Sequence, residues 1–147
     1  ALVMQGSAET HMAAAVKRAQ KALDDMSGEF EALFAGEVAA LSAAHAAFAA
    51  TGGEVERRTF FRSAHDLRGS AATLGYPLAG RMAQSLSRLL ALVEDPPPAL
   101  VAAHVEAIRA IAREKVRDAG DPVGAALAEE LDLHAERTIE PHETRSA

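Results

Sequence analysis

The sequence predicts an all-α protein. Of its 147 residues, 35 are alanine, three are isoleucine and none is tryptophan. Alanine has the highest helix propensity, whereas the β-branched and aromatic residues that favour strands are scarce. Long segments have apolar residues at helical spacing and are separated by glycine and proline. A chain of this length is typical of one domain.

The individual helices follow from this spacing. We expect a helix over residues 13–26, interrupted by Ser27 and Gly28, and a second over 29–50 that ends at a pair of glycines. Two later helix ends are expected at Gly75 and Gly120, because glycine favours helix ends. A later helix start is expected at Pro77, because proline favours first turns. The remaining predicted helices cover residues 54–74, 77–93 and 99–119, with a short sixth over 122–133.

Helices of this length joined by short connections are typical of an up-down-up-down antiparallel four-helix bundle. We expect a helical domain over residues 13–133 with its bundle core at about 29–119, an additional N-terminal helix and the short C-terminal one. Residues 1–12 have no periodicity, so we expect them to be flexible or foreign to the native chain. Residues 134–147 are expected to form a flexible acidic tail.

Charge and composition exclude several functions. Of the net charge of −6, residues 121–147 contribute −5, from seven acids and two arginines. The rest is near neutral, which argues against binding nucleic acid. The absence of cysteine excludes a disulfide, a thiolate metal site and a cysteine nucleophile. No segment has 18 or so uninterrupted apolar residues, and no signal peptide is evident. We therefore expect a soluble cytoplasmic monomer.

The helix over residues 54–74 contains the candidate site. Its buried stripe is predicted to be Phe60, Ala64, Leu67, Ala71 and Leu74, which alternate four and three apart. At about 100° per residue, His65 lies about 140° from the centre of that stripe and faces solvent. The side chains predicted on or near the same exposed face are Phe61, Ala72, Tyr76, Arg58, Arg62 and Arg68.

Gly69 lies one turn after His65. A glycine inside a helix costs about 1 kcal/mol relative to alanine, so its presence in an alanine-rich chain needs a reason. Because glycine has no side chain, it lets another surface approach the imidazole closely. The pair therefore indicates a contact site for a second protein.

The segment His65–Leu78, HDLRGSAATLGYPL, resembles the signature of histidine-containing phosphotransfer (HPt) domains of two-component phosphorelays. That signature has an aliphatic residue two positions after the histidine, a lysine or arginine at three and a glycine at four, followed by small residues and Leu-Gly. The helical layout of residues 13–119 is similar to the family's bundle with its extra N-terminal helix.

The resemblance implies that His65 accepts a phosphoryl group from the aspartate of a receiver domain and passes it to another. Arg68 then takes the basic position beside the phosphoryl group, with arginine in place of the commoner lysine, and Gly69 takes the clearance position. Several members hold a glutamine twenty-two residues after the histidine, where this chain has Ser87. Gln84 and Ser87 are therefore the candidates for orienting the imidazole.

A neutral imidazole nitrogen is a good nucleophile near pH 7, and phosphoryl transfer asks the protein mainly for positioning and positive charge. Arg68 and Arg62 would supply that charge. The docking surface for the receiver would comprise Phe61, Arg62, Ala72, Tyr76 and Arg58. The implied partners are response-regulator receiver domains and a hybrid histidine kinase. Magnesium is expected on the receiver, so this chain needs no cofactor or metal, and no kinase activity of its own is expected.

Two other functions would also fit an exposed histidine on a helical domain. The dimerising histidine-bearing module of a sensor kinase often has an acid directly after the histidine, as Asp66 is here. That module usually continues with threonine or asparagine and then proline, unlike Gly69 and Ser70. The other alternative is a helical adaptor whose histidine is vestigial.

The remaining polar residues have plainer interpretations. His45 and His104 lie in apolar helical patterns and are predicted to be core or boundary residues, and Arg57 is predicted to be solvated. Ser70 and Thr73 lack the base and oxyanion site that a hydroxyl nucleophile requires. The histidines predicted to be solvated in the chain's terminal segments are His11, His134 and His142.

Overall fold

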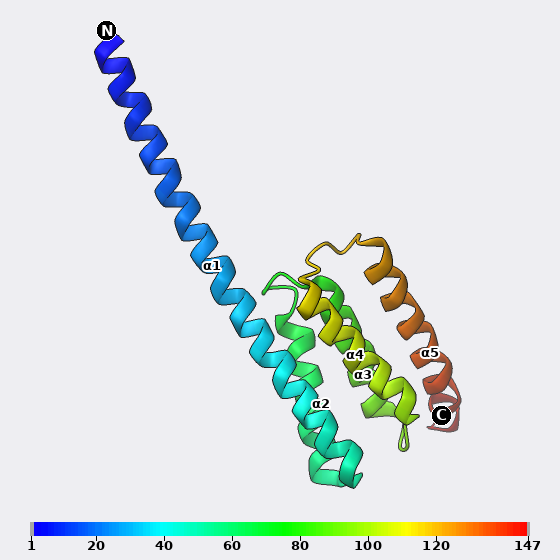
Figure 1. Ribbon diagram of the computed structural model, residues 1–147. Helices are drawn as coiled ribbons and strands as arrows, with labels where there is room; N and C mark the ends of the chain where they lie inside the picture. The colour runs from blue at the N-terminus through cyan, green and yellow to red at the C-terminus, as the bar shows by residue number, and fades with distance from the viewer. Residues whose placement is uncertain (1, 147) are drawn as a thin grey trace. The chain divides into compact units, whose positions relative to one another are not determined.

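The computed structural model describes residues 2–146, with the side chains of residues 6–142. Residues 2–146 form five helices and no strand (Figure 1), so the prediction of an all-α protein is confirmed. The helices are α1 (Leu2–Thr51), α2 (Glu54–Ser70), α3 (Pro77–Leu92), α4 (Pro98–Glu114) and α5 (Pro122–Ser146).

α1 is one continuous helix of 50 residues, so the predicted interruption at Ser27 and Gly28 is wrong. Residues 2–12 are also helical, where we expected an irregular segment. A single interior glycine costs only about 1 kcal/mol, and the alanine-rich sequence on both sides offsets that cost. The chain divides into two units, residues 1–32 and residues 33–147.

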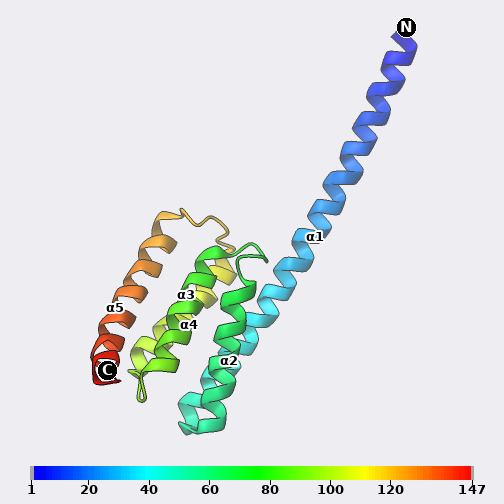
Figure 2. The same cartoon turned by 180° about the vertical axis from the view of Figure 1, so that it is seen from behind.

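The second unit is built around α3, which packs against α2, α4 and α5 (Figure 2 shows α3 flanked by α2 and α5). Every residue of the stripe predicted for α2 is buried, Phe60 and Ala64 completely. The apolar residues at helical spacing along residues 77–93 are buried as well, namely Leu78, Met82, Leu86, Leu89 and Val93. The 3.6-residue periodicity therefore identified the core faces of both helices.

The part of α1 that belongs to this unit buries Phe34, Val38 and Leu41. Within the described residues, α1 is one helix long and apolar enough to cross a membrane by length and composition, with a mean hydropathy of 1.4 over 18 residues. The core helix of a protein outside membranes passes the same test. Only 22% of that window is buried, so the burial of these three side chains does not by itself make α1 such a core helix.

Two helices end before the predicted position. α2 ends at Ser70 and a turn follows to Gly75, which has a φ of 99° that favours glycine. α4 ends at Glu114 instead of about residue 119, because Lys115 adopts the left-handed conformation with a φ of 54°. The amide of Val116 then donates to the carbonyl of Ile111 at 3.0 Å, which closes the helix end.

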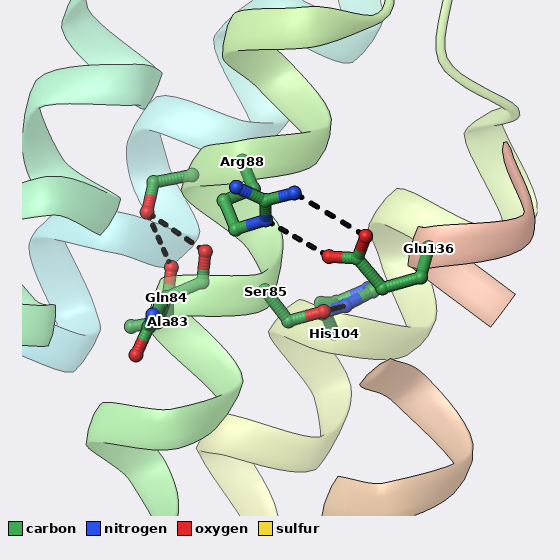
Figure 3. A network of polar contacts seen from close by, with 7 residues as sticks. Ala83, Gln84, Ser85, Arg88, His104 and Glu136 are labelled. Carbon is green, nitrogen blue, oxygen red and sulfur yellow. Dashed lines mark hydrogen bonds and ion pairs between the residues drawn. The ribbon is translucent and has the colours of Figure 1, made fainter. Parts of the chain in front are cut away.

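α5 continues to Ser146, so the prediction of a short helix followed by a loose acidic tail is wrong. The apolar stripe does not stop at residue 133 but runs through Ala135 and Ile139, both buried. Acids of α5 also pair with arginines of α3. Arg81 lies 2.7 Å from Asp132, and Arg88 donates to Glu136 at 2.9 and 3.2 Å (Figure 3). These acidic side chains of α5 therefore help to hold α5 against α3.

Arg57 joins α2 to the far end of α3, so its predicted solvated role is wrong. Its guanidinium donates to the carbonyl of Glu94 at 2.6 Å, to that of Val93 at 2.5 Å and to that of Leu90. The last carbonyls of a helix lack intrahelical partners and carry partial negative charge. One cation thus satisfies the carbonyl of Leu90 in the last turn of α3 and those of Val93 and Glu94 directly after the helix.

His104 is a core residue, as predicted, and is 0% exposed. Its Nδ1 donates to the carbonyl of Leu100 at 2.8 Å, since a carbonyl can only accept, and the hydroxyl of Ser85 then donates to Nε2 at 2.9 Å (Figure 3). Burial lowers the pKa of His104 below its ordinary value. His45 is half-buried beside Phe60, and burial lowers its pKa as well.

The depressed pKa of His104 predicts how stability depends on pH. Because the unfolded chain binds this proton more readily, the contribution is present above about pH 6.5 and is lost as pH falls through the lower folded pKa. Chemical denaturation of the wild type should give less stability at pH 5.5 than at pH 7.5.

Two variants test the cause. Ser85→Ala leaves Nε2 without a partner and should cost roughly 1–3 kcal/mol at pH 7.5. The double variant Ser85→Ala with His104→Leu replaces both polar groups, so it should recover stability at pH 7.5 and depend less on pH. A double variant with the full wild-type pH dependence would show that other groups cause it.

Candidate functional site

α2 has two flanks on either side of its buried stripe. One flank meets α1, where the Ser70 hydroxyl donates to the carboxylate of Glu37 at 2.5 Å. Ser63 and Asp66 line a cavity of about 150 Å³ on the same flank, together with Glu37. Glu37 stands at helical spacing with the apolar residues Phe34 and Leu41, so the sequence pattern does not indicate this hydrogen bond. This flank is taken up by the helix packed against it.

The other flank of α2 faces solvent and carries His65, whose predicted exposure is confirmed. At about 100° per residue, Phe61 and Arg68 fall within about 60° of His65 around the helix. Arg68 and Ala72 are exposed and Phe61 is partly exposed. The rings of Phe61 and His65 stack with centroids 5.8 Å apart and planes 26° apart. The phenyl ring supports one face of the imidazole and leaves its edge open.

Gly69 lies in open space. A Cβ built at this residue would have no atom within 4 Å outside its own helix backbone, and its φ is not in the positive range that favours glycine. Neither tight packing nor backbone conformation therefore requires glycine here. The structure leaves free the space one turn after His65.

Three exposed arginines surround the histidine on α2, Arg58, Arg62 and Arg68. Within residues 6–142, no ion pair joins any of them to an acid. An exposed guanidinium without an acidic partner retains its full positive charge and its planar set of donors. The flank around His65 is therefore electropositive, although the chain as a whole is acidic.

Tyr76 is not on this surface, and its prediction as a docking residue is wrong. The side chain is 1% exposed and stacks on Phe34 with ring centroids 3.9 Å apart. Its hydroxyl accepts a hydrogen bond from Arg117 at 3.4 Å. The helical projection that placed Tyr76 beside His65 fails, because α2 ends at Ser70 and the turn redirects the chain into the core.

α2 and α3 run antiparallel in a defined register. At one end, a Cβ on Gly80 would lie 3.5 Å from the Cβ of Ala71 and 3.6 Å from the carbonyl oxygen of Arg68. At the other end, Arg57 bonds to the carbonyls of Leu90 and Val93. The middle of α3 therefore lies at the level of His65.

Gln84 and Ser87, the two candidates for orienting the imidazole, both fall in this middle part of α3. The hydroxyl of Ser87 is buried and donates to the carbonyls of Ala83 at 2.8 Å and Gln84 at 3.1 Å (Figure 3). Its only proton is thus committed to its own helix. The Gln84 side chain is exposed. Within the described side chains, neither residue is hydrogen-bonded to His65.

The fold and this surface define a helical domain with one exposed histidine between arginines and an open glycine. The chain belongs to the Hpt domain family, whose model matches residues 9–136. Searches among curated proteins and among solved structures found no match. The resemblance seen in the motif around His65 is thereby confirmed and extended over most of the chain. Membership supports a histidine phosphotransfer role in a two-component phosphorelay and interaction with response-regulator receiver domains.

Proposed function

We propose that His65 is the phosphoryl-carrying residue of this chain. The observation that carries the proposal is an exposed imidazole beside an open glycine, in a domain of the Hpt family. An imidazole nitrogen attacks the aspartyl phosphate of a receiver domain, so that a P–N bond forms as the P–O bond breaks and the aspartate leaves as a carboxylate. The reverse step on a second receiver completes the relay.

Arg68 stabilises the transferred group in this proposal. It stands three residues after His65, so both side chains lie on the same side of α2. Phosphoryl transfer spreads negative charge over the equatorial oxygens, and positive charge beside them lowers the barrier. Arg62 adds to this field from the preceding turn. The planar fork of Arg68 can bind two phosphoryl oxygens at once, which a lysine ammonium does less specifically.

The docking surface comprises Phe61, Ala72, Arg58 and Arg62, with Gly69 as the point of closest approach. Partly exposed phenyl and methyl groups supply its apolar part, and the arginines favour an acidic partner. A receiver domain brings an acidic pocket with its magnesium ion to such a surface. We therefore propose that this chain itself uses no metal or cofactor.

Gln84 is the positioning residue we favour for the imidazole. The register of α2 and α3 brings it to the level of His65, and its side chain is exposed. Ser87 is less suited, since its short side chain is buried and its hydroxyl is held against the carbonyls of its own helix. A glutamine carbonyl beside a ring N–H would hold the tautomer in which the other nitrogen is free to attack.

The scaffold that presents this site is, in our proposal, the antiparallel up-down-up-down four-helix bundle of α1, α2, α3 and α4. The short connections Gly52–Gly53 and 71–76 support it. α5 adds a fifth helix against α3 and α4. We propose that the protein works in the cytoplasm, where hybrid histidine kinases present their receiver domains, and that it has no ATP-dependent kinase activity.

The decisive experiment is transfer from a receiver domain phosphorylated with radiolabelled phosphate. The wild type should gain acid-labile, base-stable label, the signature of phosphohistidine, and His65→Gln should gain none while keeping its thermal melt. His134→Gln, which removes another exposed histidine, should retain full labelling.

ATP and magnesium without the receiver should leave the chain unlabelled, since we assign it no kinase activity. Label on His65→Gln would move the acceptor to another histidine. Failure of the wild type to accept from any receiver tried, including those of hybrid kinases from the same genome, would favour the adaptor with a vestigial histidine.

Arg68→Ala should accept phosphate more slowly without losing acceptance. Loss of about 1.4 kcal/mol of transition-state stabilisation corresponds to a rate about tenfold lower. Arg113→Ala, which removes an exposed arginine from α4, is the control for net charge. Transfer reactions quenched at a series of times, at several receiver concentrations, measure the transfer rates of both variants. Equal rates for the two variants would reduce Arg68 to a solvated residue.

Substitutions at Gly69 should move stability and transfer in opposite directions. Because a Cβ meets open space, Gly69→Ala and Gly69→Gln should each raise the unfolding free energy by roughly 0.5–1 kcal/mol. The glutamine side chain would stand beside the imidazole, so Gly69→Gln should transfer more slowly.

Gly36 on α1 also has open space at its Cβ position and provides the matched control. Gly36→Gln should gain similar stability with no change in transfer. Destabilisation by both Gly69 substitutions would contradict the open geometry around His65.

A further inference from the structure

The first unit of the chain carries an exposed apolar stripe that the phosphotransfer role does not use. Its members on α1 alternate four and three residues apart, which is the heptad spacing of a coiled coil. The exposed fractions of the large residues are 66% for Met12, 58% for Val16, 58% for Leu23 and 49% for Met26. The complete stripe is Met12, Val16, Ala19, Leu23, Met26 and Phe30, of which Phe30 is only partly exposed.

Positions that flank the stripe suit close approach of a second helix. In heptad terms the stripe occupies positions a and d, and the flanking positions e and g are almost free of charge and bulk. They are occupied by Ala13, Ala15, Gln20, Ala22, Ser27 and Glu29. An isolated helix gains little stability without burying an apolar face, so this stripe calls for a partner.

We propose that residues 12–30 of α1 pair with the same residues of a second copy of this chain, as an antiparallel two-stranded coiled coil. This departs from the monomer that the sequence led us to expect, because the structure extends α1 unbroken through Ser27 and Gly28. Two separate short helices could not have formed the seam. The inference is independent of the phosphotransfer proposal.

Charge selects a second copy in the antiparallel orientation. The N-terminal half of the segment carries three basic residues, Lys17, Arg18 and Lys21, and the C-terminal half three acidic ones, Asp24, Asp25 and Glu29. Apart from Glu29 these charges lie at positions b, c and f, outside the seam, and Lys21 pairs with Asp25 of its own helix at 3.2 Å, so they act as the field of each half and not as ion pairs across the seam. Antiparallel pairing places each basic half beside an acidic half, whereas parallel pairing places like charges side by side.

The stripe also pairs completely with itself in this orientation. With Ala19 opposite Leu23 of the second copy, Val16 falls opposite Met26 and Met12 opposite Phe30. All six positions then lie in apolar layers, and the smallest residue faces a large one, which favours even packing. Lys17 comes to the level of Asp25 of the second copy, and Arg18 to the level of Asp24. The helix dipoles also oppose each other.

The mass of the whole chain in solution tests the pairing. Sedimentation equilibrium at tens of micromolar should give twice the monomer mass of 15.4 kDa. Leu23→Asp, which puts a charge in the central layer, should give the monomer mass. Val55→Asp changes an equally exposed apolar residue of α2 and should stay dimeric. Receiver-to-histidine transfer measured on Leu23→Asp is a separate readout, so failure of dimerisation and failure of phosphotransfer are distinguishable.

Cross-linking tests the orientation, because the chain has no cysteine of its own. Mixed chains carrying Val16→Cys and Met26→Cys should form a disulfide between the two variants, in excess of either self-linked product. Self-linking of each variant alone, with no mixed product, would mean parallel strands and would overturn the proposal.

A wild-type chain that stays monomeric at these concentrations would also overturn the proposal. The same holds for a chain that is monomeric in solution but floats with anionic phosphatidylglycerol vesicles through this stripe, since a membrane surface would then be its partner.

Discussion

The antiparallel packing of α2 on α3 is the constraint on which the site depends. At one end, Gly80 of α3 packs beside Ala71 and the carbonyl of Arg68. At the other end, Arg57 binds the carbonyls of Leu90, Val93 and Glu94 at and just after the end of α3. With the apolar stripe of α2 buried between these two points, rotation of α2 about its axis is fixed. The exposed position of His65 is therefore a consequence of core packing.

The second constraint is the division of α2 between two neighbours. Hydrogen bonding of Ser70 to Glu37 uses the flank that faces α1, which leaves the opposite flank for a partner. On that opposite flank, Phe61 supports the imidazole and Gly69 leaves room beside it. An otherwise acidic chain thus presents a small electropositive surface, which suits the acidic pocket of a receiver domain. Most of the negative charge lies elsewhere, and part of it is used where α5 pairs with α3.

The buried pair of Ser85 and His104 belongs to the scaffold, although it contains the same chemical group as the candidate site. Both imidazole nitrogens of His104 are engaged and the side chain is fully buried, so it is unavailable for phosphoryl transfer. His65 has the opposite environment, solvent on its edge and no hydrogen bond within the described side chains. Exposure and free nitrogen atoms, rather than residue type, separate the candidate carrier His65 from the structural histidine His104.

The sequence by itself determined the helical class, the buried faces of α2 and α3 and the exposed position of His65, because each depends on a periodicity that is local to one helix. It could not determine where a helix would end against tertiary contacts. Tyr76 was misplaced because a turn after Ser70 sends it onto Phe34, and the C-terminal acids were misread because their arginine partners lie about fifty residues away on α3. The role of Arg57 was hidden for the same reason. Only the tertiary structure brings such distant groups together, and their pairing energies then override the local signals of the chain.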